Sequence, residues 1–363
     1  MVERCSKCIL PASTPNISFD KNGICNFCLE YKPMQVYGEE EFLKVIEPFQ
    51  TKSKHNKYDS MIAVSGGRDS TYLMWKLVKD YNMRPLIVHY ANPFTSQQAK
   101  INLENALNIL NLDCVRWGFK EGYHINETKN ALQAWSYNPS HSMLPIICAV
   151  CKGWWPDFFR IATENQISLI VIGSNPLETA GFKKKSFGGA RDYHKISRLP
   201  KTITKGLYEL MHNPTYLYKC SWKAIIKGFL CASHSSPYIR TRYKSIKVVR
   251  LFDYIRWDEK VIMSTIKENL GWEKAPEHPS PWRFDCKLDH VRKFLYLNII
   301  GVSEYMDLLS KMIRENIITR DEAMERMRTE NETPVELVAE VLDIMGLKID
   351  KLNWPLEWTL PKN

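Results

Sequence analysis

Residues 60–70 read Ser60-Met61-Ile62-Ala63-Val64-Ser65-Gly66-Gly67-Arg68-Asp69-Ser70, and this stretch decides the fold that we predict. Its first five residues form an apolar run of strand length, and residues 71–80 carry apolar side chains at helical spacing. The two glycines between them allow a tight turn and a close approach of the backbone to an anion. The start of the following helix presents free N–H groups and a positive dipole end to the same place. The stretch therefore predicts a strand, an anion-binding turn and a helix.

Apolar strands and amphipathic helices continue to alternate downstream of this turn. We predict strands at residues 85–90, 114–117 and 168–172, and helices at residues 97–111 and 154–164. A polar stretch at residues 51–57 is interpreted as a linker that precedes the first strand. Strands and helices that alternate at this spacing are typical of βαβ units, so we expect an α/β fold with a doubly wound parallel sheet.

Ligands of such sheets bind beyond the carboxyl ends of the strands. His89, Tyr90 and Gly173 lie at these ends in the predicted sheet, and we expect them to contact a bound nucleotide.

The two ends of the chain differ from this central pattern. Residues 1–35 are short of apolar runs, rich in turns and marked by cysteines. From residue 251 onward the periodicity is helical, with predicted helices at residues 258–270, 287–298, 303–315 and 334–345 and another that begins at Thr319. We therefore expect three parts, which are a cysteine-marked module at 1–35, a nucleotide-binding domain at 36–250 and a helical region at 251–363.

The turn lacks the Gly-Lys-Ser/Thr of a Walker loop. It resembles instead the Ser-Gly-Gly-x-Asp-Ser signature of the PP-loop ATP pyrophosphatases, whose fold is related to the HUP class and whose fourth position varies. The resemblance implies that ATP is split to AMP and pyrophosphate. It also implies that the loop grips the β- and γ-phosphates while a substrate attacks the α-phosphorus. The residues that would bind ATP are Ser65, Gly66, Gly67, Arg68, Asp69 and Ser70. Asp69 and Ser70 are the expected catalytic residues, and Asp69 either holds Mg²⁺ or caps the helix.

Two Cys-x-x-Cys pairs lie near the N-terminus, Cys5 with Cys8 and Cys25 with Cys28. Four thiolates at this spacing are typical of a zinc ribbon with a structural, tetrahedral Zn²⁺. Because the segment has no core of its own, we expect the metal to supply its folding energy.

A further pair, Cys148 and Cys151, precedes a predicted helix, and Cys286 lies far downstream. Two close cysteines and a distant third can ligate a 4Fe–4S cluster with one open iron, an arrangement of related tRNA-thiolating PP-loop enzymes. Cys148 and Cys151 can also form a persulfide and disulfide pair, or all three can be buried thiols without chemistry. Cys220 or Cys231 is an alternative third ligand. Sulfurs about 6–7 Å apart would suit a cubane, and sulfurs about 4 Å apart a single metal.

Several stretches together resemble the N-acetyl sugar amidotransferase family of lipopolysaccharide and nonulosonate biosynthesis. Beside the cysteine and phosphate motifs, they are Tyr254-Ile255-Arg256-Trp257-Asp258-Glu259-Lys260, Gly271-Trp272-Glu273 and Ile318-Thr319-Arg320-Asp321-Glu322-Ala323. The resemblance implies that an amide oxygen of a nucleotide-linked or free N-acetyl sugar is adenylated, and that ammonia then displaces AMP to give an acetamidino sugar. It implies ATP, Mg²⁺ and Zn²⁺ as cofactors, and a separate glutaminase or ammonia-channel subunit as partner, because Cys5 is not terminal and has a metal role.

The paired Cys148 and Cys151 exceed what nitrogen transfer needs. The alternative function is therefore a sulfur transferase that thiolates tRNA or a small carbonyl compound. A third hypothesis is a regulatory nucleotide-binding module without chemistry.

Composition narrows the class of protein. The chain has 363 residues, of which 44% are hydrophobic and 25% charged, and we find neither an apolar run of membrane-spanning length nor an apolar leader. We therefore expect a cytoplasmic protein whose ten cysteines are not in disulfides. The formal net charge is +10, and basic residues are dense between Lys183 and Arg250, which indicates either a polyanionic partner or a solvated basic surface.

Overall fold

The computed structural model describes residues 3–178, 182, 199–220, 227, 231 and 233–353. Much of the basic stretch between Lys183 and Arg250, and the last ten residues of the expected C-terminal region, lie outside the described residues. Within the described residues, no helix combines the length and the apolar content that a bilayer crossing requires.

The centre of the fold is one parallel sheet. Its strands are β1 (Ser60–Ala63), β2 (Pro85–Tyr90), β3 (Cys114–Trp117), β4 (Leu169–Ile172) and β5 (Lys247–Arg250). They are ordered β3-β2-β1-β4-β5, and every neighbouring pair is parallel. The four predicted strands are confirmed to within one residue at each end, and β5 is an additional edge strand.

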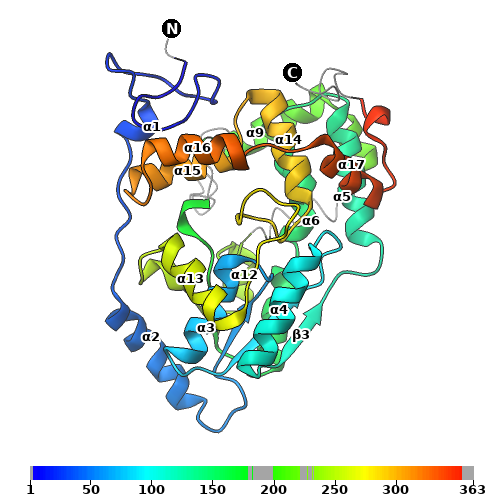
Figure 1. The fold of residues 1–363 in the computed structure, drawn as a ribbon. Helices are drawn as coiled ribbons and strands as arrows, with labels where there is room; N and C mark the ends of the chain where they lie inside the picture. The colour runs from blue at the N-terminus through cyan, green and yellow to red at the C-terminus, as the bar shows by residue number, and fades with distance from the viewer. Residues whose placement is uncertain are drawn as a thin grey trace.

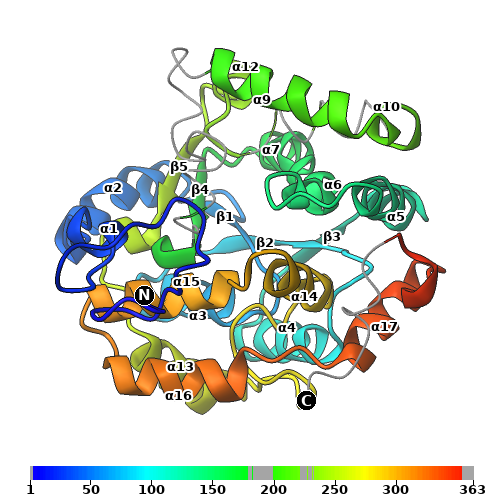
Figure 2. The same ribbon diagram turned by 90° about the horizontal axis from the view of Figure 1, so that it is seen from above.

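Helices cover both faces of the sheet (Figure 2). One face packs on α3 (Arg68–Lys79), α4 (Gln97–Leu110) and α13 (Glu259–Leu270), through strand residues that include Ile62, Ile87, Leu169 and Val171. The other face packs on α7 (Trp155–Glu164) and α12 (Pro237–Arg242), through Met61, Leu86, Val88 and Ile170. Each of these side chains contributes about 1.5–3 kcal/mol when it is buried. The predicted doubly wound α/β fold is confirmed.

The remaining elements surround this core. They are α1 (Asn26–Leu29), α2 (Glu39–Lys52), α5 (Tyr123–Ser136), η1 (Leu144–Cys148), α6 (Ala149–Lys152), η2 (Pro176–Glu178), α9 (Leu199–His212), α10 (Thr215–Lys219), η4 (Leu251–Asp253), α14 (Leu288–Ile300), α15 (Glu304–Arg314), α16 (Arg320–Glu330), α17 (Val335–Ile344) and η5 (Ile349–Lys351). The predicted C-terminal helices are confirmed in the described residues. Figure 1 shows the N-terminal loops beside α15 and α16.

Two local interpretations differ from the structure. The linker interpreted at residues 51–57 begins inside α2, which ends at Lys52. Phe42 and Ile46 are the buried residues of α2, and Pro48 lies within the helix. Because two buried residues and a proline give a weak helical pattern, the sequence does not predict α2. The amphipathic helix α5 was not predicted at all.

The order of the strands locates the candidate site. The chain proceeds from β1 outward to β2 and β3, and then returns to place β4 on the other side of β1. The connections after β1 and β4 therefore leave the sheet in opposite directions, which opens a crevice at the carboxyl ends of these two strands. Residues Ser65 to Ser70 follow β1, and Gly173 follows β4.

Candidate active site

The loop after β1 is compact because Gly66 has no side chain. Gly66 has φ +84°, and a Cβ atom there would lie 1.9 Å from the carbonyl oxygen of Ala99. The hydroxyls of Ser65 and Ser70 lie 3.2 Å apart, and Ser65 N donates to Ser70 Oγ. The loop is thus closed on itself before the chain enters α3.

Asp69 lies in the first turn of α3, whose N-cap is Gly67, so Asp69 does not cap the helix. Its Oδ1 accepts a hydrogen bond of 2.9 Å from Trp257 Nε1 and one of 3.2 Å from Arg68 Nε. The carboxylate is therefore held from two directions at the edge of the cavity.

Arg68 points away from the loop and toward the C-terminal helices. Its side chain is 2% exposed and pairs with Glu259, the first residue of α13, which also accepts a 2.7 Å hydrogen bond from Arg326. Burial raises the pKa of Glu259, but the pairing with Arg68 and Arg326 outweighs it and leaves that pKa lowered. Arg68, at the variable position of the loop, thus links the loop to α13 and α16. A contact between the Arg68 guanidinium and a phosphate stays a prediction.

The segment after β4 forms the opposite lip of the crevice. A Cβ atom on Gly173 would lie 2.9 Å from Leu73 Cβ and 3.2 Å from the Asp69 carbonyl oxygen, so the two lips can meet only at a glycine. In η2, Glu178 accepts a 2.9 Å hydrogen bond from Trp282 Nε1. Burial raises the pKa of Glu178, and the nearby Arg283 opposes the rise.

Asp285 reaches the loop from the segment that precedes α14. A Cβ atom on Gly67 would lie 3.1 Å from its carboxyl carbon, and Ser65 hydrogen-bonds its carboxyl group. Burial raises the pKa of Asp285, and the hydrogen bond from Ser65 opposes the rise. A carboxyl group thus lies where the sequence predicts phosphate binding, and a cation would offset the repulsion between the two anions.

A cavity of about 480 Å³ lies between these lips, within the range of about 300–1,000 Å³ usual for small-molecule sites. The residues that we expect to contact ATP all line it except Gly66, which packs against Ala99 of α4 instead. Those that line it are Ser65, Gly67, Arg68, Asp69, Ser70, His89, Tyr90 and Gly173. Their contacts with a nucleotide stay predictions.

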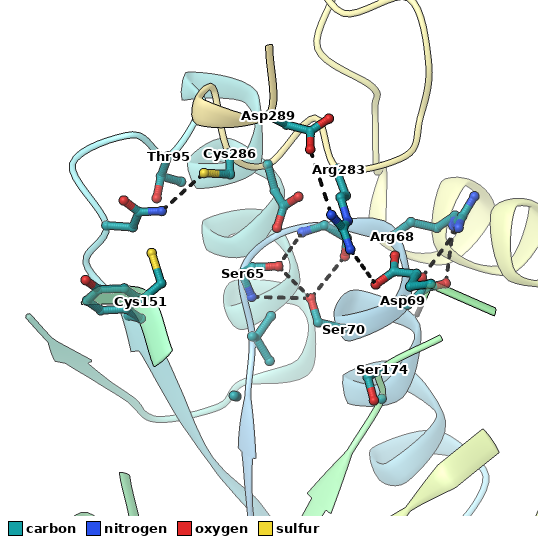
Figure 3. Close-up of a pocket in the computed structure, with 18 of the residues that line it drawn as sticks. Ser65, Arg68, Asp69, Ser70, Thr95, Cys151, Ser174, Arg283, Cys286 and Asp289 are labelled. Atoms are coloured by element: carbon teal, nitrogen blue, oxygen red, sulfur yellow. Dashed lines mark hydrogen bonds and ion pairs between the residues drawn. The ribbon is translucent and has the colours of Figure 1, made fainter. Parts of the chain in front are cut away.

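Cys148, Cys151 and Cys286 line the same cavity, and Figure 3 shows Cys151 and Cys286 there. Each sulfur has its own partner: Arg292 Nη1 lies 3.8 Å from Cys148, His124 Nε2 3.2 Å from Cys151, and Asn92 Nδ2 3.5 Å from Cys286. Among the described residues, the cysteines whose sulfurs converge as a group for a single metal ion are the four N-terminal ones and not these three. The alternatives Cys220 and Cys231 are buried and do not line the cavity.

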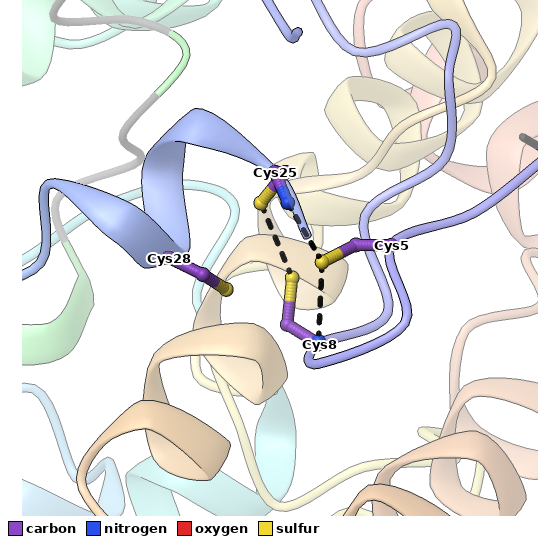
Figure 4. A group of neighbouring side chains, drawn as sticks. All are labelled: Cys5, Cys8, Cys25 and Cys28. Carbon is purple, nitrogen blue, oxygen red and sulfur yellow. Dashed lines mark hydrogen bonds between the residues drawn. The ribbon is translucent and has the colours of Figure 1, made fainter. Parts of the chain in front are cut away.

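The four N-terminal cysteines behave differently (Figure 4). All are buried, and their sulfurs lie within 4.8 Å of one another. Arg314 of α15 donates to two of these sulfurs, with Nε 3.2 Å from Cys28 and Nη2 3.4 Å from Cys8. Four converging thiol groups with a cationic neighbour suit a tetrahedral metal site.

Sequence reasoning missed several side chains at this site. Trp257 and Glu259 belong to a motif of the family resemblance that predicts no role for either residue, and Asp285 is the neighbour of Cys286. Their approach to the loop depends on chain reversal over about 190–220 residues, which periodicity does not encode. His124 carries no motif at all, and no signal in its neighbourhood would have found it.

No family model matches the chain. It is 29% identical over 110 residues to an uncharacterized protein of Methanocaldococcus jannaschii, and the match spans 29% of this chain and only 38% of that protein.

Among solved structures, the chain is similar to NMN synthetase from Francisella tularensis, with a TM-score of 0.34, 11% identity, and coverage of 77% of this chain and 94% of that chain. It is also similar to the U34-tRNA thiolase NcsA from Methanococcus maripaludis with its 4Fe–4S cluster, with a TM-score of 0.33, 12% identity and full coverage of both chains. At these TM-scores neither likeness bears on the fold or the function of this chain.

Proposed function

We propose that this chain is a PP-loop ATP pyrophosphatase that adenylates an amide or carbonyl oxygen and then transfers ammonia to the activated carbon. The observation that carries the proposal is the loop from Ser65 to Ser70. It joins β1 to α3 at the switch point of a parallel sheet and opens into a cavity with Asp69 at its edge. Free N–H groups and the dipole of α3 favour a polyphosphate at this place.

The cavity has both the volume and the side chains to bind ATP and an acceptor. Val64, Val88 and the rings of Tyr90 and Trp154 form an apolar wall that suits a purine. Arg283 and Arg292 also line the cavity, and both are paired with the carboxylates of Asp289 and Glu304. Attack of the acceptor oxygen on the α-phosphorus would release pyrophosphate, and ammonia would then displace AMP from the carbon. An amide oxygen is a poor leaving group until it carries this adenylate.

We propose an N-acetyl sugar, nucleotide-linked or free, as the acceptor, and an acetamidino sugar of surface-polysaccharide biosynthesis as the product. This choice rests on the family resemblance, whose motif residues Trp257 and Glu259 contact the phosphate loop. A separate glutaminase or ammonia-channel subunit is the proposed source of ammonia. We propose module boundaries near residues 35 and 250.

The acidic groups at the cavity suit Mg²⁺. Asp69, Glu178 and Asp285 line it, and among the described residues they do not converge as the four N-terminal sulfurs do. Mg²⁺ is usually held by one or two carboxylates together with phosphate oxygens and water, so this open arrangement fits it. When bound, the ion neutralises phosphate charge, while Trp257 and Arg68 keep the Asp69 carboxylate in place.

The N-terminal cluster suits Zn²⁺ in a structural role, because its four sulfurs are buried and form a closed set. Arg314 would offset part of the negative charge of four thiolates.

The test of the proposal is the substitution Asp69→Asn, assayed with ATP labelled at the α-phosphate and a panel of N-acetyl sugars. We expect AMP and pyrophosphate from the parent protein only when an acceptor is present. We expect Asp69→Asn to lower this rate by at least about 100-fold, because electrostatic groups of this kind contribute about that much. Asp80→Asn, at the far end of α3, is the matched control and should keep its rate. Near-normal turnover by Asp69→Asn, or formation of ADP, would contradict the proposal.

A second candidate function, sulfur transfer to tRNA or a small carbonyl compound, is favoured by one observation. The three cysteines line the same cavity as the phosphate loop. Three cysteines at one cavity can hold a 4Fe–4S cluster with an open iron, and in that case sulfide rather than ammonia would displace AMP. Anaerobic purification followed by iron analysis separates the two functions, because only the second requires iron at the cavity.

A further inference from the structure

His124 lies behind the wall of the cavity, between the hydroxyl of Tyr90 and the thiol of Cys151, two residues that line it. Its Nδ1 is 2.7 Å from Tyr90 Oη, and its Nε2 is 3.2 Å from Cys151 Sγ. One imidazole therefore connects a sulfur nucleophile to an orienting hydroxyl. This order of nucleophile, base and orienting group is the general arrangement of nucleophilic catalysis.

Aromatic rings fix the imidazole. His124 is 4% exposed and stacks on Tyr90 with ring centroids 5.7 Å apart, while Phe94 meets it edge-on at 5.4 Å. Tyr90 stacks in turn on Trp154 at 6.0 Å. The imidazole cannot turn without displacing these rings, so its two nitrogens stay directed at the same two partners.

The geometry allows a proton to pass within this pair. In the resting pair with the tautomer whose Nε2 carries no proton, Cys151 donates S–H to Nε2, and Nδ1–H donates to the Tyr90 oxygen. That tautomer places a base on the thiol proton.

Cys151 is also the cavity cysteine that combines such a base with access. It is partly exposed and lines the cavity together with the phosphate loop, and Figure 3 shows Cys151 and Asp69 on either side of Ser65. The side-chain hydrogen-bond partners of the other two sulfurs are Arg292 and Asn92, and neither side chain can take up a proton.

We propose that Cys151 is a nucleophile that displaces AMP from the adenylated acceptor, with His124 as its base and Tyr90 as the residue that positions His124. The proposal rests on the proposed function and deepens it. It adds a covalent intermediate between adenylation and the entry of ammonia.

The atoms balance without a redox partner. A bond forms between Cys151 Sγ and the imidate carbon, the carbon–oxygen bond to the phosphoryl group breaks, and AMP leaves with the electron pair. The thiol proton passes to His124 Nε2. Ammonia then adds to the same carbon, the carbon–sulfur bond breaks, and the thiolate leaves with its electron pair and recovers the proton. The product is an amidine, and the resting pair is restored.

The first experiment measures thiol reactivity and needs no acceptor. The native protein is treated with iodoacetamide, and alkylation of each cysteine is followed by peptide mass spectrometry. We expect His124→Gln to slow alkylation of Cys151 at least about tenfold, because a positioned base contributes this much or more. Tyr90→Phe should slow it by less. Cys114, on β3 and outside the cavity, is the internal control and should react equally in all variants.

An unchanged Cys151 rate in His124→Gln, with Cys114 also unchanged, would overturn the proposal. The purified parent protein provides a second route to the same result. Iron with a visible absorption band that is lost in Cys151→Ala would show that the sulfur is a cluster ligand, and the nucleophile would be excluded.

The second experiment looks for the intermediate, with ATP, Mg²⁺ and UDP-N-acetylglucosamine as the acceptor probe and without ammonia. We expect the acid-quenched protein to gain the mass of the acceptor on Cys151 and to lose it when ammonia is added. Cys151→Ala should release about one pyrophosphate per chain and form no amidine. If Cys151→Ala forms amidine at the parental rate, the proposal is wrong. If the parent protein releases no pyrophosphate with any N-acetyl sugar, the proposed function fails, and the alkylation result still decides the role of Cys151.

Discussion

The four N-terminal cysteines and the three cavity cysteines differ in which groups surround their sulfurs. Cys5, Cys8, Cys25 and Cys28 converge within 4.8 Å, are buried, and come from one short segment. Cys148 and Cys151 are three residues apart and Cys286 comes from a distant segment; all three are partly exposed, and they face three different polar side chains. Four sulfurs that converge leave no space between them for a substrate. Sulfurs that line a cavity can be reached by a substrate.

This difference teaches how to separate structural from reactive cysteines in one chain. The closed set offers four ligands and no open position, which suits a metal that stabilises a fold. The open set offers individual sulfurs, each with its own hydrogen-bond partner, which suits chemistry at a cavity.

The largest effect is expected from Cys25→Ser. Loss of one ligand should abolish metal binding and unfold residues 3–35, because the metal supplies most of the folding energy of such a module, about 10 kcal/mol or more. Metal analysis should fall from about one Zn²⁺ per chain to none, and limited proteolysis should remove the N-terminal segment. Cys286→Ser is the matched control from the open set and should keep both metal and protease resistance. Full protease resistance of Cys25→Ser would remove the contrast.

A smaller effect is expected from Arg314→Met. Its guanidinium is buried and donates to the sulfurs of Cys28 and Cys8, so its loss should lower the free energy of unfolding by about 2–4 kcal/mol. Denaturant unfolding measures this change, and the rate of zinc transfer to a chelator should rise. Arg328→Met is the control, because Arg328 is exposed and pairs only on the surface of α16, where about 0.5 kcal/mol or less is expected. Equal effects of the two variants would show that Arg314 does not support the cluster.

The smallest effect is expected from acid. Residues 3–35 contain no histidine, whereas His278 and His290 are buried beside the Cys286 segment with rings 4.7 Å apart. Burial lowers the pKa of His278 to about 4, below its usual value near 6.5, so the unfolded chain binds more protons between these pH values. This contribution to stability is complete above about pH 6.5 and is lost as the pH falls toward 4, with about 2 kcal/mol lost at pH 5.

His278→Gln should therefore reduce the difference in melting temperature between pH 7 and pH 5, as measured by calorimetry. His55→Gln, an exposed histidine before β1, is the control and should leave that difference unchanged. A parental pH dependence in His278→Gln would place the acid-sensitive group elsewhere.

The local sequence predicts most of the secondary structure of the fold. The strand from Ser60, the glycine turn and the amphipathic α3 are encoded by neighbouring residues, and periodicity predicts them. The cysteine spacing at 5, 8, 25 and 28 predicts a closed ligand set for the same reason, and those sulfurs converge. Elements with weak patterns were missed: α2 contains Pro48, and β5 is a short edge strand between basic residues.

The site was harder to predict because long-range packing assembles it. Asp285 contacts the phosphate loop only because the segment before α14 crosses above it, and Trp257 reaches Asp69 across 188 residues of sequence. The pairing of His124 with Cys151 joins α5 to α6, and no spacing in the sequence announces it. Residue types indicate which side chains are candidates for the site, but only the tertiary fold shows which of these side chains are in contact.

The contact between Arg314 and Cys28 has a consequence for biosynthesis. The two residues are 286 positions apart, so the ribosome makes the ligands near the start of its work and their cationic partner near the end. At about 5–20 residues per second, roughly 15–60 seconds pass between the two events. During that interval the nascent module is exposed without its docking surface on α15. Metal delivery during translation, or a chaperone that shields the thiols, would protect it until the C-terminal helices emerge.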